Sequence, residues 1–190
     1  MNDSGVVAAV LNRAGSLGPE AGKRSRGELP LIALDQSSAA AGAGSVAALN
    51  GTDYRSFNLV LADRTAVWFV RCDDAGEMSA WPLSAGLHMV TAHDPDDTES
   101  PRVARHLPRF QAAPPPEPPD WAAWATLLAD TDGPRDAALS VVSEHGFGTA
   151  CASLVGLPAT GSPVWLFAPG PAGGSAFGVV GSGEGAGRLL

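Results

Sequence analysis

The densest cluster of positive charge in the sequence is the stretch GKRSRGEL, residues 22–29. It holds three of the twelve Lys and Arg residues, Lys23, Arg24 and Arg26, with Ser25 between the two arginines. Its glycines leave backbone N–H groups accessible, and a helix is predicted to begin directly after it. Arginine adds planar pairs of donors that suit a carboxylate or a phosphate. We therefore predict that Lys23, Arg24, Ser25 and Arg26 bind an anionic small molecule.

The same loop also has a purely structural interpretation. Three cations this close together repel one another by about 1 kcal/mol per pair at a protein surface before salt screens them. Either a ligand or neighbouring carboxylates must compensate this repulsion, and Glu20 and Glu28 are the nearest carboxylates in the sequence. Both interpretations stay open at this point.

Two further groups of side chains offer chemistry that the spacing does not support. The members of the first group are His88, His93, Asp94, Asp96, Asp97 and His106, and those of the second are Thr149, Cys151 and Ser153. The first group fits neither a helical HExxH pair nor a calcium-binding loop, because Pro95 interrupts it, so we predict a capped turn and no metal site. The second group lies on a predicted strand without a GxSxG elbow, so we predict structural side chains and no catalytic residue.

The composition narrows the classes of function. The net charge is −8, whereas a nucleic-acid-binding domain needs a basic face, so we expect no nucleic-acid partner. No apolar run approaches the roughly 18 residues of a membrane span, and the sequence does not open with the pattern of a secretory leader. Neither Cys72 nor Cys151 belongs to a CxxC pair, so both are expected to be reduced. We expect a cytoplasmic protein, and the Ala, Gly, Pro and Arg content is typical of a bacterial genome rich in GC.

The hydrophobic pattern predicts an α+β domain with antiparallel strands. A hairpin is expected where two β-branched runs flank a short Asp-Arg-Thr turn. Polyproline at 112–119 is read as a surface strap. The expected strands are 5–11, 57–63, 66–72, 76–83, 86–93, 147–157 and 163–170, and the expected helices are 27–50 with an interruption at Gly42 and Gly44, 101–110, 121–130 and 134–143.

The first of these strands raises a question of its own. Residues 5–11 are apolar on both faces, which is typical of a strand buried on both sides. Such strands seldom lie at an unprotected chain end, because termini fray unless they are tied down. The pattern therefore suggests that the sequence starts partway through a fold.

Six segments of the sequence carry a resemblance when they are taken together. They are GVVAAVLNR, GKRSRGELPL, YRSFNLVLAD, GLHMVTAHD, GFGTACASLVGLP and PVWLFAPGP. They occur in order through most of residues 5–171, and SRGEL and FNLVLAD are the most specific parts. This set resembles the NRDE family, the transport-and-Golgi-organization-type proteins.

The resemblance implies a fold like that of the N-terminal-nucleophile (Ntn) hydrolases, with two antiparallel sheets stacked between helical layers (αββα). Family members usually begin Met-Cys, and that Cys is the expected nucleophile, with its own α-amino group as the base. Eukaryotic relatives are linked to haem mobilisation and lipid metabolism. Haem, through its propionates, is therefore one anionic ligand that the resemblance implies.

The sequence departs from the family at its start, since its second residue is Asn2 and no Asn-Arg-Asp-Glu string occurs. We therefore expect one domain over residues 1–171, truncated so that it lacks the family's first strands and the Cys nucleophile. A Gly-rich flexible tail is expected over residues 172–190. This expectation would explain why a strand apolar on both faces opens the chain.

Three functions follow as hypotheses. The first is an NRDE-family protein that is catalytically incompetent in this short form and binds an anionic small molecule at Lys23, Arg24, Ser25 and Arg26, without a cofactor or metal. The second is a cysteine Ntn amidohydrolase in a longer native form. The third is a protein-interaction module that uses the proline strap.

Overall fold

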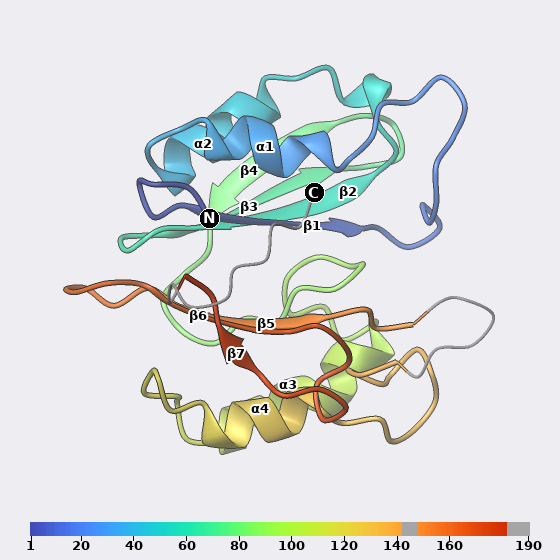
Figure 1. Cartoon of the computed structure of the whole chain (residues 1–190). Coiled ribbons are helices and arrows are strands. Elements are labelled where there is room, and N and C mark those ends of the chain that lie inside the picture. The colour runs from blue at the N-terminus through green and yellow to red at the C-terminus, as the bar shows by residue number, and fades with distance from the viewer. Residues whose placement is uncertain (142–147, 182–190) are drawn as a thin grey trace. The chain divides into compact units, whose positions relative to one another are not determined.

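The computed structural model describes residues 1–141 and 148–181 (Figure 1). The chain divides into two compact units, Met1–Ala104 and Arg105–Leu190. The first unit contains the cationic loop, and the second contains the proline-rich segment and the C-terminal strands. Each unit is built of helices and an antiparallel sheet, which confirms the predicted α+β class.

The sheet of the first unit is antiparallel and has the strand order β1-β2-β3-β4. Its central hairpin was predictable, because Asp63 closes the turn by accepting hydrogen bonds from the N–H groups of Thr65 and Ala66 at 2.7 and 3.0 Å. The register pairs Leu59 with Val70 and Asn58 with Arg71. The strands are β1 (Val7–Asn12), β2 (Phe57–Ala62), β3 (Val67–Cys72) and β4 (Met78–Pro82).

Two helices, α1 (Glu28–Leu34) and α2 (Ala39–Ala47), cover one face of this sheet (Figure 1). A short 3₁₀ turn, η1 (Gly51–Asp53), leads from α2 into β2. Alternate residues of the strands point toward the helices and form the core with them. The fully buried members of this core include Val6, Leu29, Ala33, Ala43, Val46, Phe57, Leu59, Leu61, Val70 and Cys72.

The predicted interruption of the helical segment at Gly42 and Gly44 is wrong. Both glycines lie inside α2, and the break comes earlier, where Ser38 caps α2 by accepting from the N–H of Ala41. A Cβ at Gly42 would lie 2.9 Å from the carbonyl oxygen of Ala33 and 2.9 Å from Leu61. Glycine is therefore needed there so that α2 can approach α1 and the sheet closely.

The expectation that the first strand is buried on both sides is also wrong. Among the described residues, β1 pairs with β2 alone and forms an edge of the sheet. Most of its residues are half-buried, and Ala9 is exposed. The strand is thus apolar although it lies at an edge.

Residues 86–93 form no strand, contrary to expectation. The side chain of Asn58 donates hydrogen bonds to the carbonyl oxygens of Thr91 at 2.9 Å and His93 at 2.6 Å. These carbonyl groups are thus satisfied by a side chain of β2 instead of by a neighbouring strand. The segment is held against the sheet as an irregular loop.

The second unit contains a short antiparallel sheet and two helices. α3 (Pro101–Ala112) begins in the first unit and continues into this one, and its Phe110 ring meets Trp124 of α4 (Ala122–Leu128) edge-on, with ring centroids 5.2 Å apart. The sheet has the order β5-β6-β7, with β5 (Ala152–Gly156), β6 (Val164–Ala168) and β7 (Gly178–Val179).

Several sequence predictions fall in this unit. The strands at 147–157 and 163–170 correspond to β5 and β6, and β7 lies within the segment predicted as a Gly-rich tail. The described part of the predicted helix 134–143 is a turn. Residues 142–147 and 182–190, where parts of these predictions fall, lie outside the described residues. Among the helices of the described chain, none has the length and apolar character needed to cross a bilayer.

Candidate functional site

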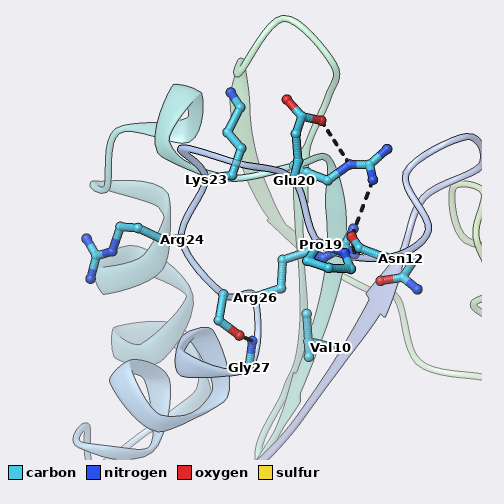
Figure 2. A pocket seen from close by; sticks show the side chains of 11 residues that line it. Val10, Asn12, Pro19, Glu20, Lys23, Arg24, Arg26 and Gly27 are labelled. Atoms are coloured by element: carbon cyan, nitrogen blue, oxygen red, sulfur yellow. Dashed lines mark hydrogen bonds and ion pairs between the residues drawn. The ribbon is translucent and has the colours of Figure 1, made fainter.

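A cavity of about 450 Å³ lies in the first unit, between the end of β1 and the loop that precedes α1 (Figure 2). All four residues predicted from the sequence as an anion site line it, so the structure brings them together at one hollow. The lining residues are Val10, Asn12, Gly18, Pro19, Glu20, Lys23, Arg24, Ser25, Arg26, Gly27 and Arg55.

Arg26 anchors the loop to the body of the unit. Its Nη1 donates to the carbonyl oxygens of Ser16 at 2.8 Å and Ser56 at 2.9 Å and to the Ser16 hydroxyl at 2.9 Å. Its Nη2 donates to the carbonyl oxygen of Gly18 at 3.3 Å. Burial, and the nearby charge of Arg55, lower the pKa of the Arg26 guanidinium. This side chain therefore holds the cavity wall in place as well as lining it.

Arg24 is paired within the protein. Its Nε lies 2.7 Å from Oε1 of Glu28 one helical turn later, and its guanidinium lies over the Tyr54 ring, 5.3 Å from the centroid. The Tyr54 hydroxyl donates to the same Glu28 oxygen at 2.8 Å. This bond, followed by the one from Arg24, lowers the pKa of Glu28. In Figure 2, Arg24 extends away from Glu20 and Pro19, so it borders the cavity from the side of the helices.

Lys23 and Ser25 are less constrained than the two arginines. Lys23 Nζ donates one hydrogen bond, to the carbonyl oxygen of Thr52 at 2.6 Å, and an ammonium group has three hydrogens to donate. The Ser25 hydroxyl accepts from the N–H of Gly27 at 3.2 Å and keeps its own hydrogen for another partner. These two side chains have donors left for a ligand.

Arg55 is the site residue that the sequence prediction missed. It precedes β2 and donates to the carbonyl oxygens of Leu17 at 2.8 Å and Gly15 at 3.1 Å, while its Nε lies 3.3 Å from Oε2 of Glu20. Glu20 therefore compensates Arg55 and not one of the three predicted cations. No local pattern around Arg55 signals this role, because its partners lie 35 or more residues earlier in the chain.

The charge of the lining is unusual for this chain. Four of the lining residues are cationic and one, Glu20, is anionic, whereas the whole protein carries a net charge of −8. The electrostatic potential at the cavity is thus positive although the net charge of the protein is negative, and this favours the entry of an anion. Gly18, Pro19 and Gly27, which have no polar side chain, also line the cavity.

The histidine and aspartate group at residues 88–106, for which the sequence predicts a capped turn, is distributed over separate networks. Asp94 bridges two arginines, with Oδ1 at 2.6 Å from Arg13 Nη1 and Oδ2 at 2.7 Å from Arg71 Nη1. Asp96 instead accepts from His88 Nδ1 at 2.5 Å and from the N–H of Met89 at 2.7 Å. These contacts fix the loop after residue 86 by side-chain hydrogen bonds.

Two of the remaining side chains come close enough to Glu99 for the three to offer ligands to one ion. His93, Asp97 and Glu99 place one ligand atom each within 4.8 Å of the others, and His93 Nδ1 lies 3.5 Å from Asp97 Oδ2. Glu99 was not part of the sequence prediction. His106 belongs to the second unit, where its buried ring bonds the carbonyl oxygen of Ala137 at 2.7 Å.

Acid is expected to destabilise the first unit through Asp94. Its burial alone would raise the carboxyl pKa, but Arg13 and Arg71 outweigh this effect and hold the pKa below its ordinary value. A carboxyl group whose pKa is lowered by folding contributes stability above its unfolded pKa, and this stability is lost as the pH falls through the folded pKa.

The test compares the parent with Asp94→Asn. At neutral pH the variant is expected to be less stable by about 2 kcal/mol, since the pair is partly exposed. The gap should close as the pH falls below about 4. Urea unfolding at a series of pH values measures it, and a gap that does not change with pH would contradict the assignment.

Both cysteines are free. Cys72 is buried beneath Gly51, and burial raises the pKa of its thiol to about 11. A thiol with this pKa is almost entirely protonated at neutral pH and is a poor nucleophile. Cys151 is exposed at the start of β5.

Comparison with protein-family models and with curated proteins found no match to this chain. The cationic cavity is therefore interpreted from its own geometry.

Proposed function

We propose that this chain is an NRDE-family protein that binds a small anionic molecule in the cavity between β1 and the loop 18–27. The observation that carries the proposal is the lining of that cavity, with four cationic side chains and one carboxylate in a protein of net charge −8. Its volume of about 450 Å³ lies in the range of small-ligand pockets.

The proposed relationship to the Ntn hydrolases rests on the sequence resemblance, and the α+β content of the two units is compatible with it. The first unit supplies an antiparallel sheet with helices on one face, and the second supplies another antiparallel sheet with helices of its own. An αββα stack is composed of two such halves. The proposed function is binding and not catalysis. The cavity lining includes one hydroxyl side chain, Ser25, and no thiol that could serve as a nucleophile instead. It also includes no imidazole and no second carboxylate that could activate the hydroxyl as a base.

Free donors at the site define the chemistry of the ligand. Lys23 and Ser25 have hydrogens to donate, and the Glu20–Arg55 pair can open toward an anion that competes with the Glu20 carboxylate. A carboxylate or phosphate group matches these donors. The propionates of haem are one source of such carboxylates, and a small organic acid is another.

The test uses two variants with opposite expected effects. Lys23→Met removes a cation that makes a single internal bond, and we expect affinity for the anion to fall about fivefold. Glu20→Gln removes the only carboxylate of the lining and frees Arg55, so affinity should rise about fivefold. Arg26 is avoided here, because its loss would also loosen the cavity wall.

Isothermal titration calorimetry with inorganic phosphate, succinate and haem at low and high salt measures these effects. Glu99→Gln is the matched control, since it removes the same charge at an exposed residue outside the lining, and it should leave the affinity unchanged. Absence of binding by the parent to all three probes, or equal effects of Glu20→Gln and Glu99→Gln, would overturn the proposal.

A further inference from the structure

The outer edge of β1 is the least protected strand edge of the first unit. β1 pairs with β2 on one side, and among the described residues no strand pairs with its other side. Its sequence, Val7-Ala-Ala-Val-Leu-Asn12, contains no charge and no proline. Edge strands are usually protected by charges, prolines or bulges, because their free N–H and C=O groups otherwise pair with another chain. The opposite edge, β4, ends at Pro82.

We propose that β1 pairs antiparallel with β1 of a second copy of this chain, across a two-fold axis that passes between the two copies of Ala9. The two four-stranded sheets then form one continuous sheet. This inference does not depend on the proposed anion binding.

The alternation of the strand fixes this register. Directly opposite residues of an antiparallel pair point to the same face of the sheet, whereas neighbours along one strand point to opposite faces. In a symmetric pairing, one residue must therefore lie opposite its own copy, and the axis cannot lie between two different residues. Centring on Ala9 places Val7 opposite the partner's Leu11 and Ala8 opposite the partner's Val10. Every cross-strand pair within residues 7–11 is then apolar, and the residue that meets its own copy is the small and exposed Ala9. Centring on Val10 would instead oppose Ala8 to the partner's Asn12.

Charge at the two ends of β1 favours an antiparallel partner. The start of β1 lies near the end of α1, because the Asn2 side chain donates to the carbonyl oxygens of Leu34 at 2.7 Å and Gln36 at 2.8 Å. Asp3 and Asp35 are exposed in these two segments. The other end of β1 adjoins the positive cavity, whose lining includes Asn12.

Antiparallel pairing brings the acidic start of one strand beside the basic end of the other. This local complementarity offsets the repulsion between two chains of net charge −8. A parallel pairing would instead place like ends together. The same charges therefore select the antiparallel arrangement and a second copy as the partner.

A cysteine at the axis tests the geometry directly. In a Cys151→Ser background, Ala9→Cys is expected to form an intermolecular disulfide under mild oxidation, because opposite Cβ atoms lie about 4.5–5.5 Å apart. The matched control is Ala8→Cys, whose partner copy is diagonal, at about 7–8 Å, and should not cross-link. Equal yields from the two variants, or no cross-linked dimer from Ala9→Cys, would overturn the proposal.

Sedimentation equilibrium tests the same pairing without a cross-link. The parent should dimerise with rising concentration, and Ala9→Lys should raise the dissociation constant at least tenfold, because two lysines would face each other at the axis. Ala40→Lys, at an exposed residue of α2, is the charge-matched control and should dimerise like the parent. Circular dichroism confirms that both variants fold. A parent that is monomeric at all concentrations contradicts the pairing.

Discussion

Replacement of Asn58 by alanine is expected to lower the free energy of unfolding by about 3 kcal/mol. Asn58 lies in the middle of the sheet and is fully buried. Its amide nitrogen donates to Thr91 and His93, and its oxygen accepts from Arg13 Nη1 at 2.7 Å. Alanine leaves two carbonyl oxygens and a guanidinium group without this partner, and each buried unsatisfied group costs about 1–3 kcal/mol.

Chemical denaturation of Asn58→Ala and of Asn50→Ala separates this effect from a general cost of losing an asparagine. Asn50 caps the exposed turn η1 by accepting from the N–H of Thr52, and its replacement should cost about 1 kcal/mol. Asn58→Asp is expected to be nearly as damaging as Asn58→Ala, because a carboxylate cannot donate to the two carbonyl oxygens. A cost for Asn58→Ala no larger than that for Asn50→Ala would mean that the loop 86–93 is not held by this side chain.

Arg26→Ala is expected to cost about 2–3 kcal/mol of stability, the second-largest effect. The guanidinium joins the loop at Ser16 and Gly18 to Ser56 beside β2 through four hydrogen bonds. Hydrogen bonds from a charged group contribute about 1.5–3 kcal/mol. Arg26→Lys should recover little of the loss, because one ammonium group cannot reach acceptors on both sides of the planar fork.

Arg24→Ala is the matched control for Arg26→Ala. Arg24 lies in the same loop and carries the same charge, but its ion pair with Glu28 is exposed, so its loss should change the melting temperature little. Thermal unfolding of both variants measures the difference. Equal destabilisation by the two substitutions would contradict the distinction between an anchoring arginine and a surface arginine.

The parts of the fold that the sequence predicted are those with local causes. The hairpin of β2 and β3 depends on β-branched runs and on Asp63, which closes its own turn. The helix at 101–112 begins at a proline after Ser100. In both cases the residues that determine the element lie within it, so inspection of one segment was enough.

The predictions that were wrong concern segments whose structure depends on contacts with residues distant in the chain. Residues 86–93 have the composition of a strand, but a side chain of β2 takes two of their carbonyl groups. Gly42 looks like a helix breaker, but it lies inside α2 because the backbone of Ala33 passes close to it. Neither contact can be inferred from the residues near it in the sequence.

The candidate site was predictable to a similar degree. Local charge density identified Lys23, Arg24, Ser25 and Arg26, all of which line the cavity. The sequence could not indicate that Arg26 anchors the loop while Lys23 keeps free donors, since both roles depend on carbonyl groups supplied by Ser56 and Thr52. Arg55 was missed for the same reason, because its site partners come from the loop before α1.

An anion is proposed to enter the cavity between β1 and the loop 18–27. An NMR titration of the isotope-labelled protein with inorganic phosphate tests it most directly, because backbone amide and arginine Nε–H signals report contacts residue by residue. The account predicts saturable shifts of Lys23, Ser25, Gly27 and the Arg55 Nε–H, which are reduced by Lys23→Met and enlarged by Glu20→Gln. Shifts that do not saturate, or that fall outside the cavity lining, would contradict it.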